Sequence, residues 1–178
     1  MIRELEFKIL CQRHRDEIYR YARALLANRA DAEDATQEVL LRLWNHLPRI
    51  NPFKIRAWLL RTTRNHCLDQ IRRRSNRNTP LLMEDDILDD RPDELAINPS
   101  FAADSSFRLE QARDALQRLP EKLRSVFVLY EVNGLRYREI AQTLGMPINT
   151  VKVYLARARE RLSNLVTEEE PWTKTCNS

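Results

Sequence analysis

Cationic and amide side chains recur along one face of a segment near the C-terminus, residues 137–162. Ala141 and Gly145 lie four residues apart in this segment. This spacing is typical of a helix-turn-helix, with a small residue where two helices cross and a glycine where the turn needs a positive φ. The polar face of the second helix would carry Asn149, Lys152, Arg157, Arg159 and Arg161. Such a face suits the phosphates and base edges of a DNA major groove. The alternative is a small helical hairpin with a solvated basic face, but the apolar, glycine and cationic positions agree in favouring DNA binding.

A second basic face is predicted on a helix over residues 53–75, where Leu59 and Leu68 face inward. The residues on its outward side are Arg56, Arg61, Arg64, Asn65, Arg72 and Arg73. N-terminal to both basic segments, residues 32–46 are predicted to form an amphipathic helix, which Asp31 would cap. The polar side of that helix shows Asp34, Gln37, Glu38 and Arg42, with Trp44 near it. By residue type alone, residues 32–46 are an ordinary amphipathic helix with a capped start.

The elements that must position these faces are all helical. Further helices are predicted over 4–27, 107–119 and 121–132. The chain has only 2 glycines and shows no strand-type alternation. We therefore predict an all-α fold of two small helical domains joined by a flexible acidic linker, with the helix-turn-helix in the C-terminal domain. The expected boundaries are 1–80 and 108–166 for the domains, 81–107 for the linker and 167–178 for a tail.

Charge is distributed unevenly along the chain, whose formal net charge is +4. Both predicted domains are basic, which indicates a polyanionic partner. The linker is strongly acidic, and Pro80, Pro92 and Pro99 punctuate the region around it, so a packed core is not expected there.

Several classes of protein are disfavoured by composition. No apolar run reaches the ~18 residues of a membrane helix, and no signal-peptide core is present, so a cytoplasmic protein with free thiols is expected. Cys11, His14, His66 and Cys67 match no standard zinc pattern and are interpreted as packing residues, with no metal and no cofactor. No catalytic constellation and no small-molecule substrate site emerge, which argues against an enzyme.

Three stretches taken together resemble the extracytoplasmic-function (ECF) group of bacterial RNA polymerase sigma factors. They are DAEDATQEVLLRLW (31–44), IRAWLLRTTRNHCLDQIRRR (55–74) and LPEKLRSVFVLYEVNGLRYREIAQTLGMPINTVKVYLARARERL (119–162). The resemblance covers nearly the whole chain outside the linker and the tail. One departure is Arg136, which stands where the family often has a capping Ser or Thr.

The resemblance implies a sigma factor that binds core RNA polymerase, through its β and β′ subunits, and promoter DNA. The residues implied to bind polymerase are Asp31, Asp34, Gln37, Glu38 and Trp44. Those implied to bind the minus-ten element, together with the loop 46–54, are Arg56, Arg61, Asn65, Asp69, Arg72 and Arg73. At the minus-thirty-five element, Asn149, Lys152, Val153 and Ala156 would face bases, while Arg157 and Arg159 would bind phosphates.

By the same resemblance, an anti-sigma factor holds the protein inactive, and a membrane-bound inhibitor would keep it at the inner membrane. The residues alone leave two other functions possible. A helix-turn-helix repressor or activator that binds no polymerase would need a ligand or dimerisation domain. An enzyme acting on nucleic acid would need clustered acids for a metal, whereas the acids here lie in a proline-punctuated linker.

Overall fold

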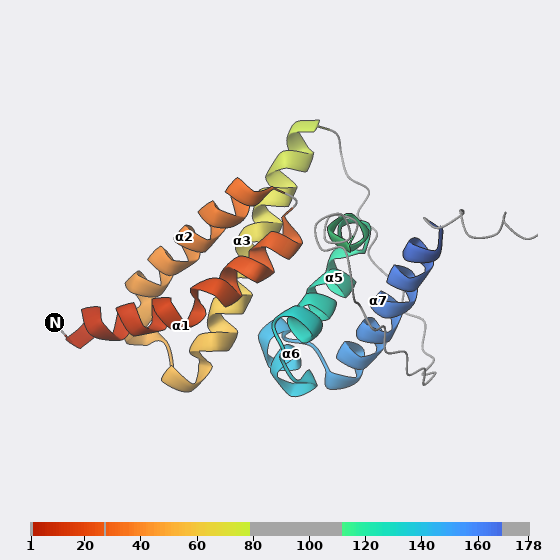
Figure 1. The fold of residues 1–178 in the computed structure, drawn as a ribbon. Helices are drawn as coiled ribbons and strands as arrows, with labels where there is room; N and C mark the ends of the chain where they lie inside the picture. The colour runs from red at the N-terminus through yellow and green to blue at the C-terminus, as the bar shows by residue number, and fades with distance from the viewer. Residues whose placement is uncertain (1, 27, 79–111, 169–178) are drawn as a thin grey trace, which may run out of the picture.

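The computed structural model describes residues 2–26, 28–78 and 112–168, and these form helices and turns without any strand (Figure 1). The all-α prediction is therefore confirmed. The predicted linker, at 81–107, and the tail beyond residue 168 lie outside the described residues.

Three long helices make the N-terminal half: α1 (Ile2–Leu25), α2 (Arg29–His46) and α3 (Ile55–Asn78). The predicted cap of α2 was wrong. Asn28 has the extended backbone of an N-cap, and its Oδ1 accepts a hydrogen bond from the Ala30 N–H at 2.8 Å. Asp31 instead lies within the first turn of α2, where its carboxylate pairs with Arg74 of α3 at 2.6 Å.

Two short 3-10 turns, Leu47–Arg49 and Pro52–Lys54, connect α2 to α3. A proline near the start of each turn fits this geometry because its φ is fixed and its missing N–H costs nothing there. The Asn51 side chain accepts a hydrogen bond from the Phe53 N–H at 3.0 Å, which fixes the second turn.

The C-terminal half contains α5 (Glu121–Phe127), which continues into the π-helical turn η3 (Val128–Val132), then α6 (Tyr137–Leu144) and α7 (Ile148–Glu168). Helices α6 and α7 form the predicted helix-turn-helix. Gly145 has φ +68° between them, and its N–H donates to the Ala141 carbonyl at 2.9 Å. At the start of α6, where a capping Ser or Thr is missing, the Glu139 carboxylate accepts a hydrogen bond from the Arg136 N–H at 2.7 Å.

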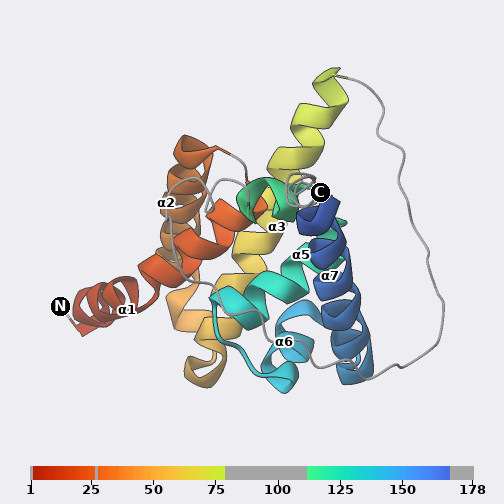
Figure 2. The same cartoon turned by 45° about the vertical axis from the view of Figure 1, so that its right-hand side comes forward.

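The two halves, which the sequence predicted to be two domains, pack against each other in this structure. Tyr21 of α1, Leu129 of η3 and Ile140 of α6 are all fully buried in one hydrophobic cluster. A second cluster, with Ile18 and Leu43 at its centre, belongs to the N-terminal half alone. Figures 1 and 2 both show α2 on one side of the molecule and α7 on the opposite side.

Candidate nucleic-acid and protein interfaces

The solvent face of α7 carries the residues predicted to read bases. Asn149, Lys152 and Ala156 are exposed, and Val153 is half-buried beside them. On the other side of the helix, Val151, Leu155 and Ala158 are buried against α5 and α6. The apolar stripe thus fixes the rotation of α7, and the structure brings the four predicted residues onto one free face.

The two flanking arginines of α7 are placed differently. Arg157 is half-buried. Arg159 contacts η3, where its Nη2 lies 2.7 Å from the Glu131 Oε1 and its guanidinium lies over the Tyr130 ring at 5.4 Å from the centroid. Tyr130 in turn stacks on Tyr137 with ring centroids 5.2 Å apart. Arg159 therefore lies at the edge of the face predicted to read bases, and its guanidinium is already paired with the Glu131 carboxylate of the same chain.

Part of the predicted polymerase-binding set lies on the free side of α2. Asp34 and Gln37 are exposed, and Glu38 forms an ion pair with Arg42 at 2.8 Å. Asp31 is held by Arg74, as described above. Trp44 is half-buried, because Phe7 packs against its ring in an edge-to-face arrangement at 5.1 Å and the Arg3 guanidinium covers it at 4.6 Å.

Leu41 is a residue that the sequence analysis missed. Its side chain is 59% exposed, although it is a large aliphatic residue in the middle of α2. It lies four residues after Gln37 and three before Trp44, so the three share one side of the helix. The signal was available in the helical phase, because Leu41 lies two residues, or about 200° around the helix, from both Val39 and Leu43 of the buried stripe.

The predicted minus-ten residues divide into two groups on α3. Asn65, Asp69, Arg72 and Arg73 are exposed, with only a 3.8 Å contact between Asp69 and Arg72 among them. Arg61 is also exposed, and its Nη2 approaches Gly145 of the helix-turn-helix.

Arg56 was wrongly placed on the same outward stripe. It lies five residues before Arg61, which rotates it well away from that stripe at 3.6 residues per turn. Its guanidinium instead contacts Glu17 of α1 and the C-terminal half. Arg64, also expected on the outward side, pairs with Glu121 of α5.

Phe53 lies in the loop 46–54, but the sequence did not single it out among the residues predicted to contact DNA. Its side chain is 99% exposed at the turn before α3, between the exposed cations Arg49 and Lys54. An aromatic ring that contacts no core, held on a capped turn beside cations, offers a surface on which an unpaired base can stack.

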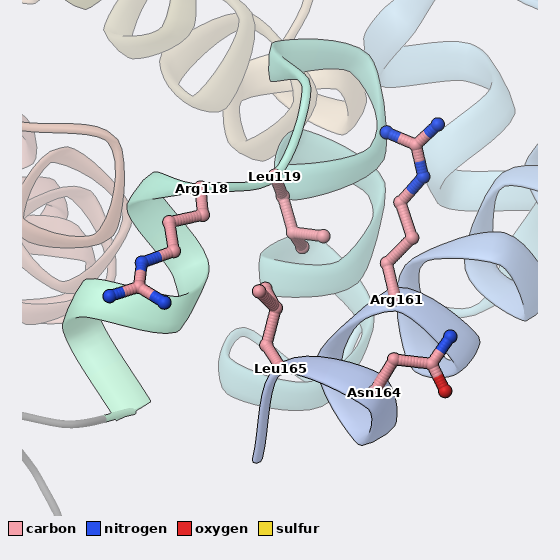
Figure 3. Close-up of a pocket in the computed structure, with 5 residues that line it drawn as sticks. All are labelled: Arg118, Leu119, Arg161, Asn164 and Leu165. Atoms are coloured by element: carbon pink, nitrogen blue, oxygen red, sulfur yellow. The ribbon is translucent and has the colours of Figure 1, made fainter. Parts of the chain in front are cut away.

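Other kinds of site are weakly represented in the described part of the chain. It contains no group of three or more His, Cys, Asp or Glu side chains that could hold a metal ion, and no helix long and apolar enough to cross a membrane. An open cavity of about 270 Å³ lies between the start of α5 and the end of α7 (Figure 3). Leu119 and Leu165 point toward one another across it, and its other lining residues are Arg118, Arg161 and Asn164.

Comparison with known proteins matches both halves of the chain. The family model for Sigma-70 region 2 matches residues 10–77, and the model for Sigma-70, region 4 matches residues 109–162. The chain is 33% identical to the ECF RNA polymerase sigma factor SigE of Mycolicibacterium smegmatis over 92% of its own length and 63% of that protein. It is 30% identical to the ECF RNA polymerase sigma factor SigM of Mycobacterium tuberculosis, over 90% of this chain and 76% of the relative. The chain thus spans less than two thirds of SigE.

Solved structures show the same fold. The sigma factor RpoE, in complex with the anti-sigma factor NepR from Bartonella quintana, superposes with a TM-score of 0.71 at 25% identity, over 91% of this chain and 97% of that one. CnrH, in complex with the cytosolic domain of CnrY, superposes with a TM-score of 0.70 at 24% identity, over 93% and 90% of the two chains. The paired region matches and the relatives at 30% identity or more lead to one conclusion: this chain belongs to the ECF group of RNA polymerase sigma factors.

Proposed function

We propose that this protein is an alternative sigma factor, which binds core RNA polymerase and directs it to specific promoters. The observation that carries the proposal is the presence of exposed faces on three different elements, with Lys152 on α7, Arg72 on α3 and Leu41 on α2. A subunit that holds a protein while it contacts two DNA elements needs separate faces. The expected division into domains at 1–80 and 108–166, with a linker and a tail, belongs to the same proposal.

The α7 face recognises the minus-thirty-five element. Lys152 donates to a guanine O6 or N7, and Val153 and Ala156 contact thymine methyl groups. Asn149 lies at the N-terminal end of the helix, which enters the groove first in this motif. Arg157 and Arg159 contact phosphates, which position the helix without specifying sequence.

The α3 face and the turn before it contact the minus-ten element. Asn65, Asp69, Arg72 and Arg73 line its exposed side, and Arg56 and Arg61 complete the set once the C-terminal half moves away. Phe53 stacks on an unpaired base, since every base has a π face and the neighbouring Arg49 and Lys54 attract the strand.

The α2 face docks on the polymerase, at the β′ and β subunits. Leu41 supplies an apolar anchor, and the polar residues around it, Asp34, Gln37 and Glu38, form a rim. Trp44 and Asp31 support this face, since both are held by contacts within the N-terminal half.

An anti-sigma factor controls the protein and masks these faces. Support comes from the likeness to RpoE, which was solved with its anti-sigma factor NepR. The protein acts in the cytoplasm and is held at the inner membrane where the inhibitor is membrane-bound.

Gel filtration with purified bacterial core RNA polymerase tests the proposal. The chain should comigrate with core polymerase, and the mixture should start transcription at a defined subset of a promoter library. A chain that binds duplex DNA specifically but does not comigrate with core polymerase would be a repressor or activator instead.

A further inference from the structure

Arg56 of α3 joins three elements that are distant in the sequence. Its Nη2 lies 2.6 Å from the Glu17 Oε1 of α1 and donates a hydrogen bond to the Asn133 carbonyl at 2.9 Å. Its Nη1 lies 3.6 Å from the Glu139 Oε1 of α6. Burial alone would raise the pKa of Glu17, but hydrogen bonds from His14 and Arg56 outweigh that effect and lower it. One arginine therefore connects the N-terminal half to the start of the helix-turn-helix.

Arg64, two turns further along α3, makes a second connection. Its Nε and Nη2 each donate to one carboxylate oxygen of Glu121 at 2.8 Å. The side chains are 19% and 29% exposed, so this bidentate pair is partly shielded from water. The Ser125 hydroxyl donates to the Glu121 Oε1 at 2.7 Å and orients the carboxylate.

Backbone contacts close the remainder of this seam between the two halves. Arg124 Nη1 donates to the Leu25 carbonyl at 3.3 Å, Gln117 Nε2 to the Ala24 carbonyl at 3.0 Å, and Asn133 Nδ2 to the Glu17 carbonyl at 3.0 Å. Beneath them lies the shared apolar cluster that contains Tyr21 and Leu129.

The seam also contains polar atoms that the closed arrangement leaves unpaired. Asn133 Oδ1 and Arg124 Nε are buried and have no hydrogen-bond partner among the described residues. Such atoms cost free energy that hydration would return if the halves separated. Apolar burial and ion pairs therefore stabilise the closed seam, and the unpaired atoms destabilise it. Such a balance suits an interface that opens.

We propose that the two halves of the chain close on each other without a partner and that the ion pairs of Arg56 and Arg64 act as the latch that holds them together. When the chain opens, a polyanionic nucleic-acid strand competes with the acidic side of the C-terminal half for this part of α3. In the closed state, Glu17, Glu121 and Glu139 take the place of phosphates on the two arginines. Arg61, on the exposed side of α3, lies near Gly145, so the closed C-terminal half borders that side as well. The competition rests on the proposed role of α3 in DNA binding, whereas the self-closure does not.

Small-angle X-ray scattering of the full chain tests the closure. The wild-type chain should stay near the radius of gyration of about 16 Å that a compact chain of this length has. Arg64→Glu and Glu121→Arg should each enlarge it, and the two together should restore it because the pair re-forms with reversed charges. Arg72→Glu is the matched control, because it makes the same charge change on α3 where the partner is Asp69 of the same helix. Circular dichroism confirms that each variant keeps its helices. An expanded wild-type chain, or a double variant that stays expanded, overturns the latch.

Fluorescence anisotropy with a short labelled single DNA strand of mixed sequence tests the competition. Glu121→Gln and the control Glu160→Gln each remove one negative charge from the C-terminal half, but only the first removes a seam pair. Glu121→Gln should bind the strand about two- to fivefold more tightly than Glu160→Gln, the range expected from one partly exposed ion pair. Equal affinities overturn the competition. If the wild-type chain is closed but the variants that open it bind no DNA, the proposed role of α3 is overturned. If the wild-type chain is open and binds DNA, only the latch is overturned.

Discussion

Glu131 of η3 and Arg159 of α7 form an ion pair at 2.7 Å at the edge of the predicted DNA-reading face. The pair is about two-fifths exposed on each side, and Arg159 also lies over the Tyr130 ring. The Glu131 carboxylate therefore pairs with the Arg159 guanidinium, which the sequence predicts to bind a DNA phosphate.

This relationship gives opposite expectations for the two partners. Arg159→Ala should weaken binding evenly across DNA sequences and reduce the slope of log affinity against log salt by about 1, because one phosphate contact is lost. Glu131→Ala should strengthen binding, since it releases Arg159 and removes a repulsive charge. Filter binding over a series of salt concentrations measures both slopes. An Arg159→Ala variant with unchanged slope would show that Arg159 serves only to hold α7 on η3.

Lys152 should behave as a base-reading residue. Lys152→Ala is expected to cost about 1–3 kcal/mol at the preferred sequence and to relax preference at one base pair. Selection from a randomised upstream element, compared with Arg159→Ala, separates the two roles. Identical sequence profiles for the two variants would mean that the wrong face of α7 was assigned to the bases.

The α2 face should depend on its exposed leucine. Leu41→Ala, alone or with Asp34→Arg and Gln37→Ala, should abolish or strongly weaken the complex with core polymerase while the helical content is retained, because the face loses its apolar anchor and its charge pattern. Leu5→Ala is the matched control, since Leu5 is 62% exposed on α1 and Leu41 is 59% exposed. Wild-type affinity in the Leu41→Ala, Asp34→Arg and Gln37→Ala triple variant would remove α2 from the polymerase interface.

Phe53 should matter only where bases are unpaired. Phe53→Ala is expected to weaken binding to a single strand by about 1–3 kcal/mol, the usual value of base–aromatic stacking, and to leave duplex binding unchanged. Phe53→Trp should restore the affinity because it keeps the stacking surface. Protein stability should not move in either variant, since the side chain is 99% exposed. An equal loss on duplex and single-stranded DNA would contradict a stacking role.

The lowered pKa of Glu17 predicts a pH dependence of stability. Burial works against the lowering, and hydrogen bonds from His14 and Arg56 cause it. A carboxyl whose pKa is lower in the folded state stabilises the protein above its unfolded pKa, and this contribution is lost as pH falls through the folded value. Urea unfolding should therefore show Glu17→Gln to be less stable than wild type at neutral pH, by about 1–2 kcal/mol since Arg56 is partly exposed. The difference should shrink as the pH falls below 4.5, the ordinary value for this group. A difference that is constant from neutral to acid pH would show that the charge of Glu17 is not what stabilises the fold.

Local patterns in the sequence were sufficient for the helices and for the helix-turn-helix. Gly145 needs a left-handed backbone and Val151 belongs to an apolar stripe, and both facts depend only on near neighbours. The orientation of α7, with Lys152 and Ala156 toward solvent, followed from the same stripe. Leu41 and Phe53 could have been found in the same way. Leu41 is out of phase with the buried stripe of its helix, and Phe53 follows a proline in a polar loop.

The tertiary structure alone decided the partners of the arginines. Arg56 and the Asn133 carbonyl are 77 positions apart in the chain, and Arg64 and Glu121 are 57 positions apart. Helical phase separates Arg56 from the stripe that contains Arg61, but no local rule says which arginine of α3 meets a carboxylate or where in the chain that carboxylate lies. That choice depends on how two apolar surfaces, one from each half, bury against one another. The burial of Tyr21 with Leu129 brings α3 beside α6 and within reach of Glu121 on α5, and it thereby assigns Arg56 and Arg64 to the seam.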